Sequence, residues 1–153
     1  MNKLNNILVI NGPNLNLLGD REPSIYGNIK LKDIEESLIK LGKNNLYEID
    51  CIQSNHEGEL IEAIQNASRS HFGIIINAGG YSHTSIALMD ALKSFSKPII
   101  EVHMSNIYAR EKFRHESYIS RAANGSICGF GALGYELAVY SIIKLLEKKN
   151  NKY

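Results

Sequence analysis

The stretch Gly73-Ile-Ile-Ile-Asn77 runs directly into Ala-Gly-Gly-Tyr-Ser-His83. Three consecutive isoleucines between glycine and asparagine are typical of a strand buried on both faces, as in a parallel sheet. Other short apolar or alternating runs predict further strands at 6–10, 47–53, 97–103 and 126–130. The central strand and the glycine-rich turn after it therefore indicate a sheet with polar side chains where its strands end.

Helical periodicity separates these predicted strands. Apolar residues recur three and four positions apart within 31–41, 60–67, 88–95 and 132–149. Ser54 and Glu57 have the spacing of a capping box, which predicts the start of the second helix. Strands that alternate with helices imply a parallel sheet covered on both faces. We predict an α/β, three-layer flavodoxin-like fold with strand order 2-1-3-4-5, and a single catalytic domain over residues 1–153.

Charge and length exclude several kinds of partner. The chain has 153 residues, with 17 Lys+Arg and 16 Asp+Glu, and a formal net charge of +1. A nearly neutral chain has no bulk field for nucleic acid or an acidic membrane, so we expect neither partner. It lacks a signal-peptide pattern and any apolar run of ~18 residues, which predicts a cytoplasmic location. Cys51 and Cys128 fit no metal spacing and are expected to be buried thiols.

Polar side chains follow three of the predicted strands. Asn11-Gly-Pro-Asn14 follows the first strand, Asn77 to His83 the third, and Glu101-Val-His-Met-Ser-Asn106 ends the fourth. In the predicted order these strands are neighbours, and open α/β sheets bind ligands at this edge. Arg110 or Arg114, in the charged segment that follows, is a candidate for holding a carboxylate.

Known cofactor motifs are missing from the chain. It contains no dinucleotide or P-loop glycine motif, no G-x-S-x-G and no metal-binding histidine pair. Arginine, tyrosine, histidine, asparagine and serine remain at the predicted edge. This set indicates acid–base chemistry or binding of a small anion without a metal or cofactor.

Two further segments carry candidate residues. Segment 14–28 has no sustained periodicity and includes Arg21 and Tyr26, and such loops are often lids over a site. His83 is predicted in the first turn of the third helix, where backbone N–H groups favour an anion. Asp90, seven residues later, is expected on the same helical face.

Several blocks of this sequence resemble the type II 3-dehydroquinate dehydratases. The blocks are Asn11-Gly-Pro-Asn-Leu-Asn-Leu-Leu-Gly19, Arg21-Glu-Pro23 with Ile25-Tyr-Gly27, Gln53 to Leu60, Asn77-Ala-Gly-Gly-Tyr-Ser-His-Thr-Ser85 and Glu101 to Asn106. The resemblance implies a lyase that converts 3-dehydroquinate to 3-dehydroshikimate by anti elimination through an enolate. It implies no cofactor and no Schiff base, a flavodoxin-like fold, and a homododecamer built from trimers. The reaction belongs to the shikimate pathway of aromatic amino acid biosynthesis or to quinate catabolism, and the sequence leaves both open.

The resemblance also implies a role for individual residues. Tyr26 is the base that takes the C2 proton, and Arg21 stabilises its phenolate. His103 is the general acid, and Asn14 positions a water near the enolate oxygen. The substrate is expected to contact Asn77, His83, Asp90, Arg114 and the backbone of Met104 and Ser105, with Asp90 acting within its subunit or across a boundary. Glu101, which would tune His103, and Gly79 are supporting positions.

The alternative is a flavodoxin-like small-ligand or nucleotide-binding regulatory module. A receiver-like domain needs acidic residues after the first strand, where this chain has Asn11-Gly-Pro-Asn14. A nucleotide binder needs a phosphate loop rich in Ser, Thr and Gly there, and Pro13 with Leu15, Leu17 and Leu18 does not supply one. The residues therefore favour the enzyme.

Overall fold

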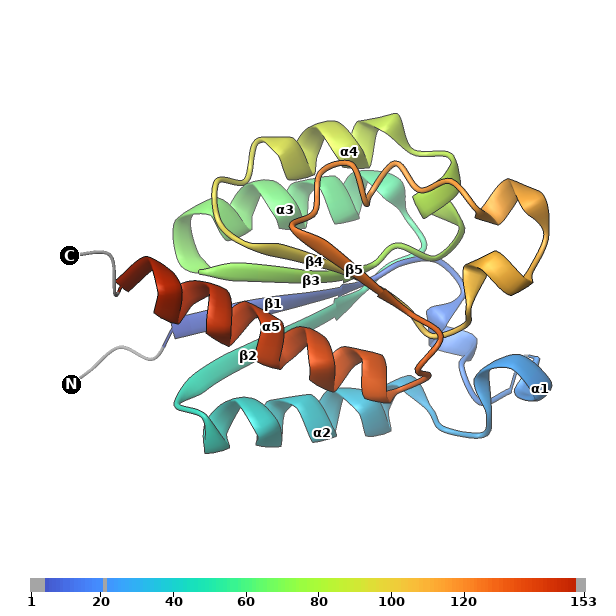
Figure 1. Cartoon of the computed structure of the whole chain (residues 1–153), viewed down its shortest axis with the longest axis horizontal. Helices are drawn as coiled ribbons and strands as arrows, with labels where there is room; N and C mark the ends of the chain where they lie inside the picture. The colour runs from blue at the N-terminus through green and yellow to red at the C-terminus, as the bar shows by residue number, and fades with distance from the viewer. Residues whose placement is uncertain (1–4, 21, 151–153) are drawn as a thin grey trace.

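The computed structural model describes residues 5–20 and 22–150 and has one five-stranded parallel sheet (Figure 1). In spatial order its strands are β2 (Tyr47–Gln53), β1 (Asn5–Asn11), β3 (Gly73–Asn77), β4 (Ile99–His103) and β5 (Gly125–Cys128). Every adjacent pair is parallel. The predicted order 2-1-3-4-5 and the flavodoxin-like architecture are confirmed.

Helices cover both faces of the sheet (Figure 1). One face carries α2 (Leu31–Asn44) and α5 (Leu133–Asn150), and the other carries α3 (Glu57–Ser70) and α4 (Ile86–Lys93). Alternate residues of β1 enter the two cores, because successive strand side chains point to opposite faces. This is why the strand runs are apolar at every position rather than at every second one. None of the described helices is long and apolar enough to cross a membrane.

The short helices lie at the end of the sheet where its strands finish (Figure 1). Segment 14–28 lacks sustained periodicity in its sequence, but it contains the 3-10 helix η1 (Leu15–Leu17) and the short helix α1 (Pro23–Tyr26) and is not the plain loop that was expected. After β3 comes η2 (Gly79–His83), and after β4 come η3 (Ile107–Ala109) and η4 (Lys112–Arg114). These turns surround the strand ends and leave room for a site among them.

Two helix starts differ from the sequence expectation. His56 is the N-cap of α3 and makes no side-chain cap bond, so the predicted capping box is absent. The Ser54 hydroxyl instead accepts from the backbone N–H of His56 (2.9 Å) and donates to Glu59. His83 ends η2 rather than opening α4, whose N-cap is Ser85. The expected position of His83 in a first helical turn, on one helical face with Asp90, was therefore wrong.

Close contact between β1 and β3 brings their ends together. The Gly12 N–H donates to the carbonyl of Asn77 (2.8 Å). A Cβ at Gly12 would lie 2.4 Å from the carbonyl oxygen of Ala78, closer than atoms pack, so only glycine fits. Cys51 on β2 and Cys128, the last residue of β5, are half-buried, less than expected.

Candidate active site

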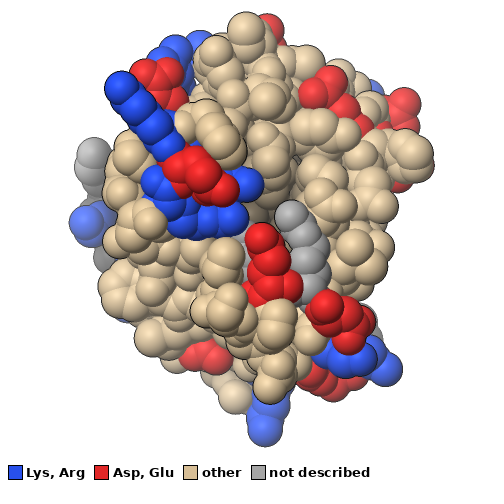
Figure 2. All heavy atoms as spheres, turned by 90° about the vertical axis from the view of Figure 1, so that its right-hand side faces the viewer, with Lys and Arg blue, Asp and Glu red and all other residues tan. Residues whose placement is uncertain are grey.

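A cavity of about 160 Å³ lies at the carboxyl ends of β1, β3 and β4. Figure 2 views the molecule from this side and shows a hollow with basic and acidic side chains nearby. The predicted site residues that line the cavity are Asn14, Asn77, Gly79, His83, His103, Met104, Ser105 and Arg114. All of them except Arg114, which lies on η4, come from three separate strand ends, as the order of the sheet predicted.

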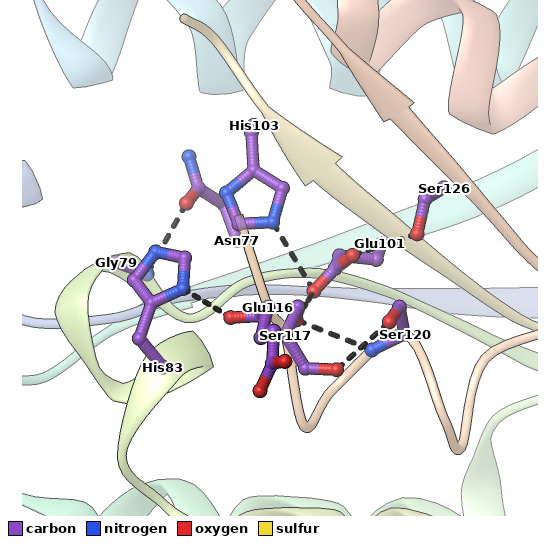
Figure 3. Close-up of polar contacts among 9 residues, drawn as sticks. All are labelled: Asn77, Gly79, His83, Glu101, His103, Glu116, Ser117, Ser120 and Ser126. Atoms are coloured by element: carbon purple, nitrogen blue, oxygen red, sulfur yellow. Dashed lines mark hydrogen bonds and ion pairs between the residues drawn. The ribbon is translucent and has the colours of Figure 1, made fainter. Parts of the chain in front are cut away.

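Glu101 and His103 form a buried pair on β4. The Glu101 carboxylate is 1% exposed and accepts hydrogen bonds from Ser117 and from Ser126 (2.6 Å), as Figure 3 shows. His103 Nε2 lies 3.1 Å from Glu101 Oε2. Burial acts to raise the pKa of Glu101, but His103 and the serine hydroxyls lower it more, to below its ordinary value. The ionised carboxylate therefore lies directly beside an imidazole of the cavity wall, a ring that can act as a general acid.

His83 is the second imidazole of the cavity. Its ring stacks on that of His103, with centroids 6.0 Å apart, and its Nδ1 lies 2.7 Å from the carbonyl oxygen of Glu116 (Figure 3). Burial lowers the pKa of His83, and the nearby His103 and Arg114 lower it further. The hydrogen bond to the Glu116 carbonyl acts to raise the pKa but does not outweigh the burial. A carbonyl only accepts, so Nδ1 carries the hydrogen and Nε2 remains an acceptor in the neutral ring.

Asn77 is held by a buried network. Its Nδ2 donates to the hydroxyl of Tyr135 (2.9 Å), and its Oδ1 accepts from the Gly79 N–H (3.2 Å). The Tyr135 hydroxyl in turn donates to Oδ1 of Asn11 (2.6 Å). Sequence reasoning missed Asn11 and Tyr135 as parts of the site, because an asparagine at a strand end and a tyrosine among helical apolar positions also fit purely structural roles.

Asn14 has a left-handed backbone, with φ 68°. Its N–H donates to Asn55 Oδ1 (3.0 Å), which also accepts from Gln53 Nε2 (3.1 Å). Gln53 reaches back to the carbonyl of Gly12 (3.2 Å). Side chains from the end of β2 therefore support the turn that carries Asn14 to the cavity.

Among the described residues, two guanidinium groups lie in the cavity wall. Arg114 Nε donates to Glu111 (2.9 Å), and Arg110 Nη1 donates to the Ser105 hydroxyl (3.2 Å). Both arginines line the cavity, although one was expected. Together they make this wall suited to a carboxylate.

Four predicted site residues are not in the cavity lining within the part of the chain that the structure describes: Glu101, which contacts His103, and Arg21, Tyr26 and Asp90. Arg21 lies outside the described residues, and so does the side chain of Tyr26, whose backbone ends α1. Asp90 is exposed on α4 and does not line the cavity. Their roles stay predictions. Within the described part of the chain, no group of three or more His, Cys, Asp or Glu is arranged to hold a metal ion.

Comparisons with known proteins agree with this geometry. The family model "Dehydroquinase class II" matches residues 5–143. The chain is 53% identical to 3-dehydroquinate dehydratase 1 of Agrobacterium fabrum, over 90% of this chain and 95% of that protein. It is 54% identical to the 3-dehydroquinate dehydratase of Prochlorococcus marinus, over 93% and 98%. The crystal structure of type II dehydroquinase from Butyrivibrio crossotus superposes with a TM-score of 0.89 at 46% identity, over 91% of this chain and 97% of that one. The chain therefore belongs to the class II dehydroquinase family.

Proposed function

We propose that this chain is a hydro-lyase that dehydrates 3-dehydroquinate to 3-dehydroshikimate in the shikimate pathway. The observation that carries the proposal is the buried, ionised Glu101 beside His103 at a cavity that also contains Arg114. A general acid and a carboxylate-binding group at one site suit a small hydroxy acid that loses water. The relatives' names support the same reaction, and no relative reported above supports the regulatory-module alternative.

Proton abstraction is the first proposed step. The phenolate of Tyr26 takes the C2 proton, and the C–H electron pair moves into the adjacent carbonyl to form an enolate. A free tyrosine titrates near ~10, so a base at neutral pH needs a neighbouring cation. Arg21 is proposed to supply that charge, and Asn14 to hold a water at the enolate oxygen.

Loss of the hydroxyl completes the elimination. The enolate reforms the carbonyl, the new carbon–carbon double bond forms, and the neighbouring C–O bond breaks as His103 gives its proton to the leaving oxygen. Water leaves, and proton transfer from Tyr26 to solvent and from solvent to His103 restores the starting state. The two groups act from opposite sides in the proposed anti geometry. The substrate carbonyl accepts the electrons, so we infer that no metal, organic cofactor or Schiff base is needed.

Substrate binding is assigned to the remaining cavity groups. Arg114 and the backbone of Met104 and Ser105 are proposed to hold the carboxylate, while Asn77 and His83 bind hydroxyl oxygens. The neutral His83 ring supports an acceptor role for Nε2. Gly79 supports the site through its N–H on Asn77.

The assembly, domain and location are also proposals. We infer one catalytic domain over residues 1–153, acting in the cytoplasm as a homododecamer built from trimers. The exposed Asp90 on α4, away from the cavity of its own subunit, supports a role across a subunit boundary. Light scattering of the purified protein tests the assembly, and cell fractionation tests the location. A monomer with full activity would exclude the role of Asp90 across subunits.

A dehydratase assay tests the reaction. The purified chain is treated with chelator, given 3-dehydroquinate and followed at the absorbance of the enone product; undiminished turnover is expected. Borohydride should not inactivate the enzyme in the presence of substrate. Loss of activity with chelator, or a trapped substrate adduct, would overturn the mechanism.

Two substitutions test the assigned proton transfers. Tyr26→Phe and His103→Ala should each reduce kcat by about 100-fold or more, because each removes a group that transfers a proton. Circular dichroism should show that both variants remain folded. Near-normal turnover by either variant would remove that residue from the mechanism.

A further inference from the structure

The hydroxyl of Tyr135 bridges the ends of two neighbouring strands. Asn11 and Asn77 are register partners in β1 and β3, so their side chains point to the same face of the sheet. Tyr135, in the first turn of α5, is completely buried above them. Its hydroxyl lies 2.6 Å from Asn11 Oδ1 and 2.9 Å from Asn77 Nδ2. A residue outside the cavity wall therefore contacts the cavity residue Asn77 directly.

Hydrogen-bond polarity fixes the direction of every bond in this network. The Gly79 backbone N–H, 3.2 Å from the Asn77 amide, can only donate, so the atom it meets must be Oδ1 (Figure 3). The other end of the amide, Nδ2, then faces Tyr135 and donates to it. The tyrosine hydroxyl has one hydrogen, which goes to Asn11 Oδ1. One backbone N–H thus sets the orientation of three side chains.

The cost of this arrangement is visible at Asn11. Among the residues that the structure describes, its Nδ2 is buried without a hydrogen-bond partner. If the Asn11 amide were reversed, its Nδ2 would face the Tyr135 hydroxyl. The hydroxyl would then lie between two N–H donors, and its own hydrogen would have no acceptor. The unpaired Asn11 Nδ2 is therefore the consequence of supplying Tyr135 with an acceptor.

We propose that Tyr135 is a positioning residue, which sets the orientation in which the Asn77 amide meets the substrate, and that Asn11 fixes the direction in which Tyr135 donates. The proposal rests on the proposed function, since Asn77 is assigned there to substrate. Asn77 Nδ2 donates one of its two hydrogens to Tyr135, so the second remains available for a substrate oxygen. A reversed or freely turning amide would offer an acceptor to that oxygen.

Burial suits Tyr135 to this role. It raises the pKa of the phenol well above its ordinary value, and the Asn77 amide only partly opposes this. The hydroxyl therefore keeps its hydrogen throughout the working pH range. Neither Tyr135 nor Asn11 lines the cavity, so their substitution changes no direct contact with the substrate.

Kinetics of the full-length enzyme test the proposal. Tyr135→Phe is expected to lower kcat/KM about tenfold, the effect of one oriented hydrogen bond, mainly by raising KM. Asn11→Ala should have an effect of similar size, and it carries the test if Tyr135→Phe fails to fold. Tyr140→Phe, at a 47% exposed position of the same helix, is the matched control and should behave as wild type.

A double-mutant cycle separates positioning from general stability. In an Asn77→Ala background, Tyr135→Phe should change kcat/KM less than about twofold, because its effect passes through Asn77. An equal loss in both backgrounds, or normal kcat/KM in folded Tyr135→Phe and Asn11→Ala, would overturn the proposal.

Neutron diffraction of the ligand-free protein tests the amide orientation without any activity. Two deuterons are expected on the Asn77 atom that faces Tyr135. An oxygen there would overturn the proposal even in an active enzyme. If wild type does not turn over 3-dehydroquinate, the proposed function fails, and this structure still decides the orientation.

Discussion

His103 and Glu101 lie two residues apart on β4, with Nε2 of the imidazole 3.1 Å from Oε2 of the carboxylate. Residues at this spacing share one side of a strand, so the carboxylate lies below the ring and the cavity lies beyond it. The Ser117 hydroxyl donates to the same Oε2, and the Ser126 hydroxyl donates to Oε1. His103 is therefore the group between a buried negative charge and the cavity, where a proton donor is needed.

Replacing the charge of Glu101 tests this relationship. Glu101→Gln keeps the shape but removes the buried charge beside Nε2 of His103, so kcat should fall about 10- to 100-fold. The loss is measured as kcat with saturating 3-dehydroquinate. Glu62→Gln, at an exposed position of α3, is the control. Wild-type kcat in folded Glu101→Gln would show that the carboxylate does not act through His103.

His83 should make the folded protein sensitive to acid. Its pKa is lower in the folded protein than in the unfolded chain, so on acidification the unfolded chain binds the proton first. Its contribution to stability is therefore complete above ~6.5 and is lost as the pH falls through the folded value. The fall in Tm between pH 7.5 and pH 5 should be smaller in His83→Gln than in wild type. His56→Gln, on an exposed residue, should match wild type, and an equal fall in all three would contradict the prediction.

Gly12→Ala should be strongly destabilising. The new methyl would lie 2.4 Å from the carbonyl oxygen of Ala78, so β1 and β3 must separate at the cavity. We expect the free energy of unfolding to fall by about 1–3 kcal/mol and turnover to fall with it. Gly58→Ala is the matched control, because its Cβ meets nothing within 4 Å inside α3. Gly58→Ala should raise the free energy of unfolding, measured with urea, by at most about 1 kcal/mol. Wild-type stability in Gly12→Ala would mean that the strand ends tolerate separation.

The strand order could be predicted because the buried strands carry an unbroken signal. In a parallel sheet covered on both faces, runs such as Ile74 to Ile76 are apolar at every position, and helices between them leave few topologies. The same topology brought Asn14, Asn77 and His103 to one edge. The starts of helices were harder to predict. Ser54 and Glu57 have the spacing of a capping box, but the Ser54 hydroxyl donates to Glu59 instead.

Roles that depend on burial could not be predicted from the sequence. Tyr135 lies among apolar positions of its helix, and only the fold shows its hydroxyl between two asparagines. The position of His83 was misjudged because the turn after β3 continues as η2, which delays the start of α4 to Ile86. Both residues depend on contacts between segments far apart in the chain.

Two substitutions of Asn14 separate the roles of its backbone and its side chain. The residue has φ 68°, a conformation that costs roughly 1–2 kcal/mol for most side chains and almost nothing for glycine. Asn14→Gly should therefore keep nearly wild-type stability, whereas Asn14→Ala should lose about 1 kcal/mol in urea unfolding. Both remove the amide proposed to hold a water, so both should lose kcat to a similar extent. If Asn14→Gly turned over normally while Asn14→Ala did not, the residue would serve the turn alone, and the water at the enolate oxygen would need another partner.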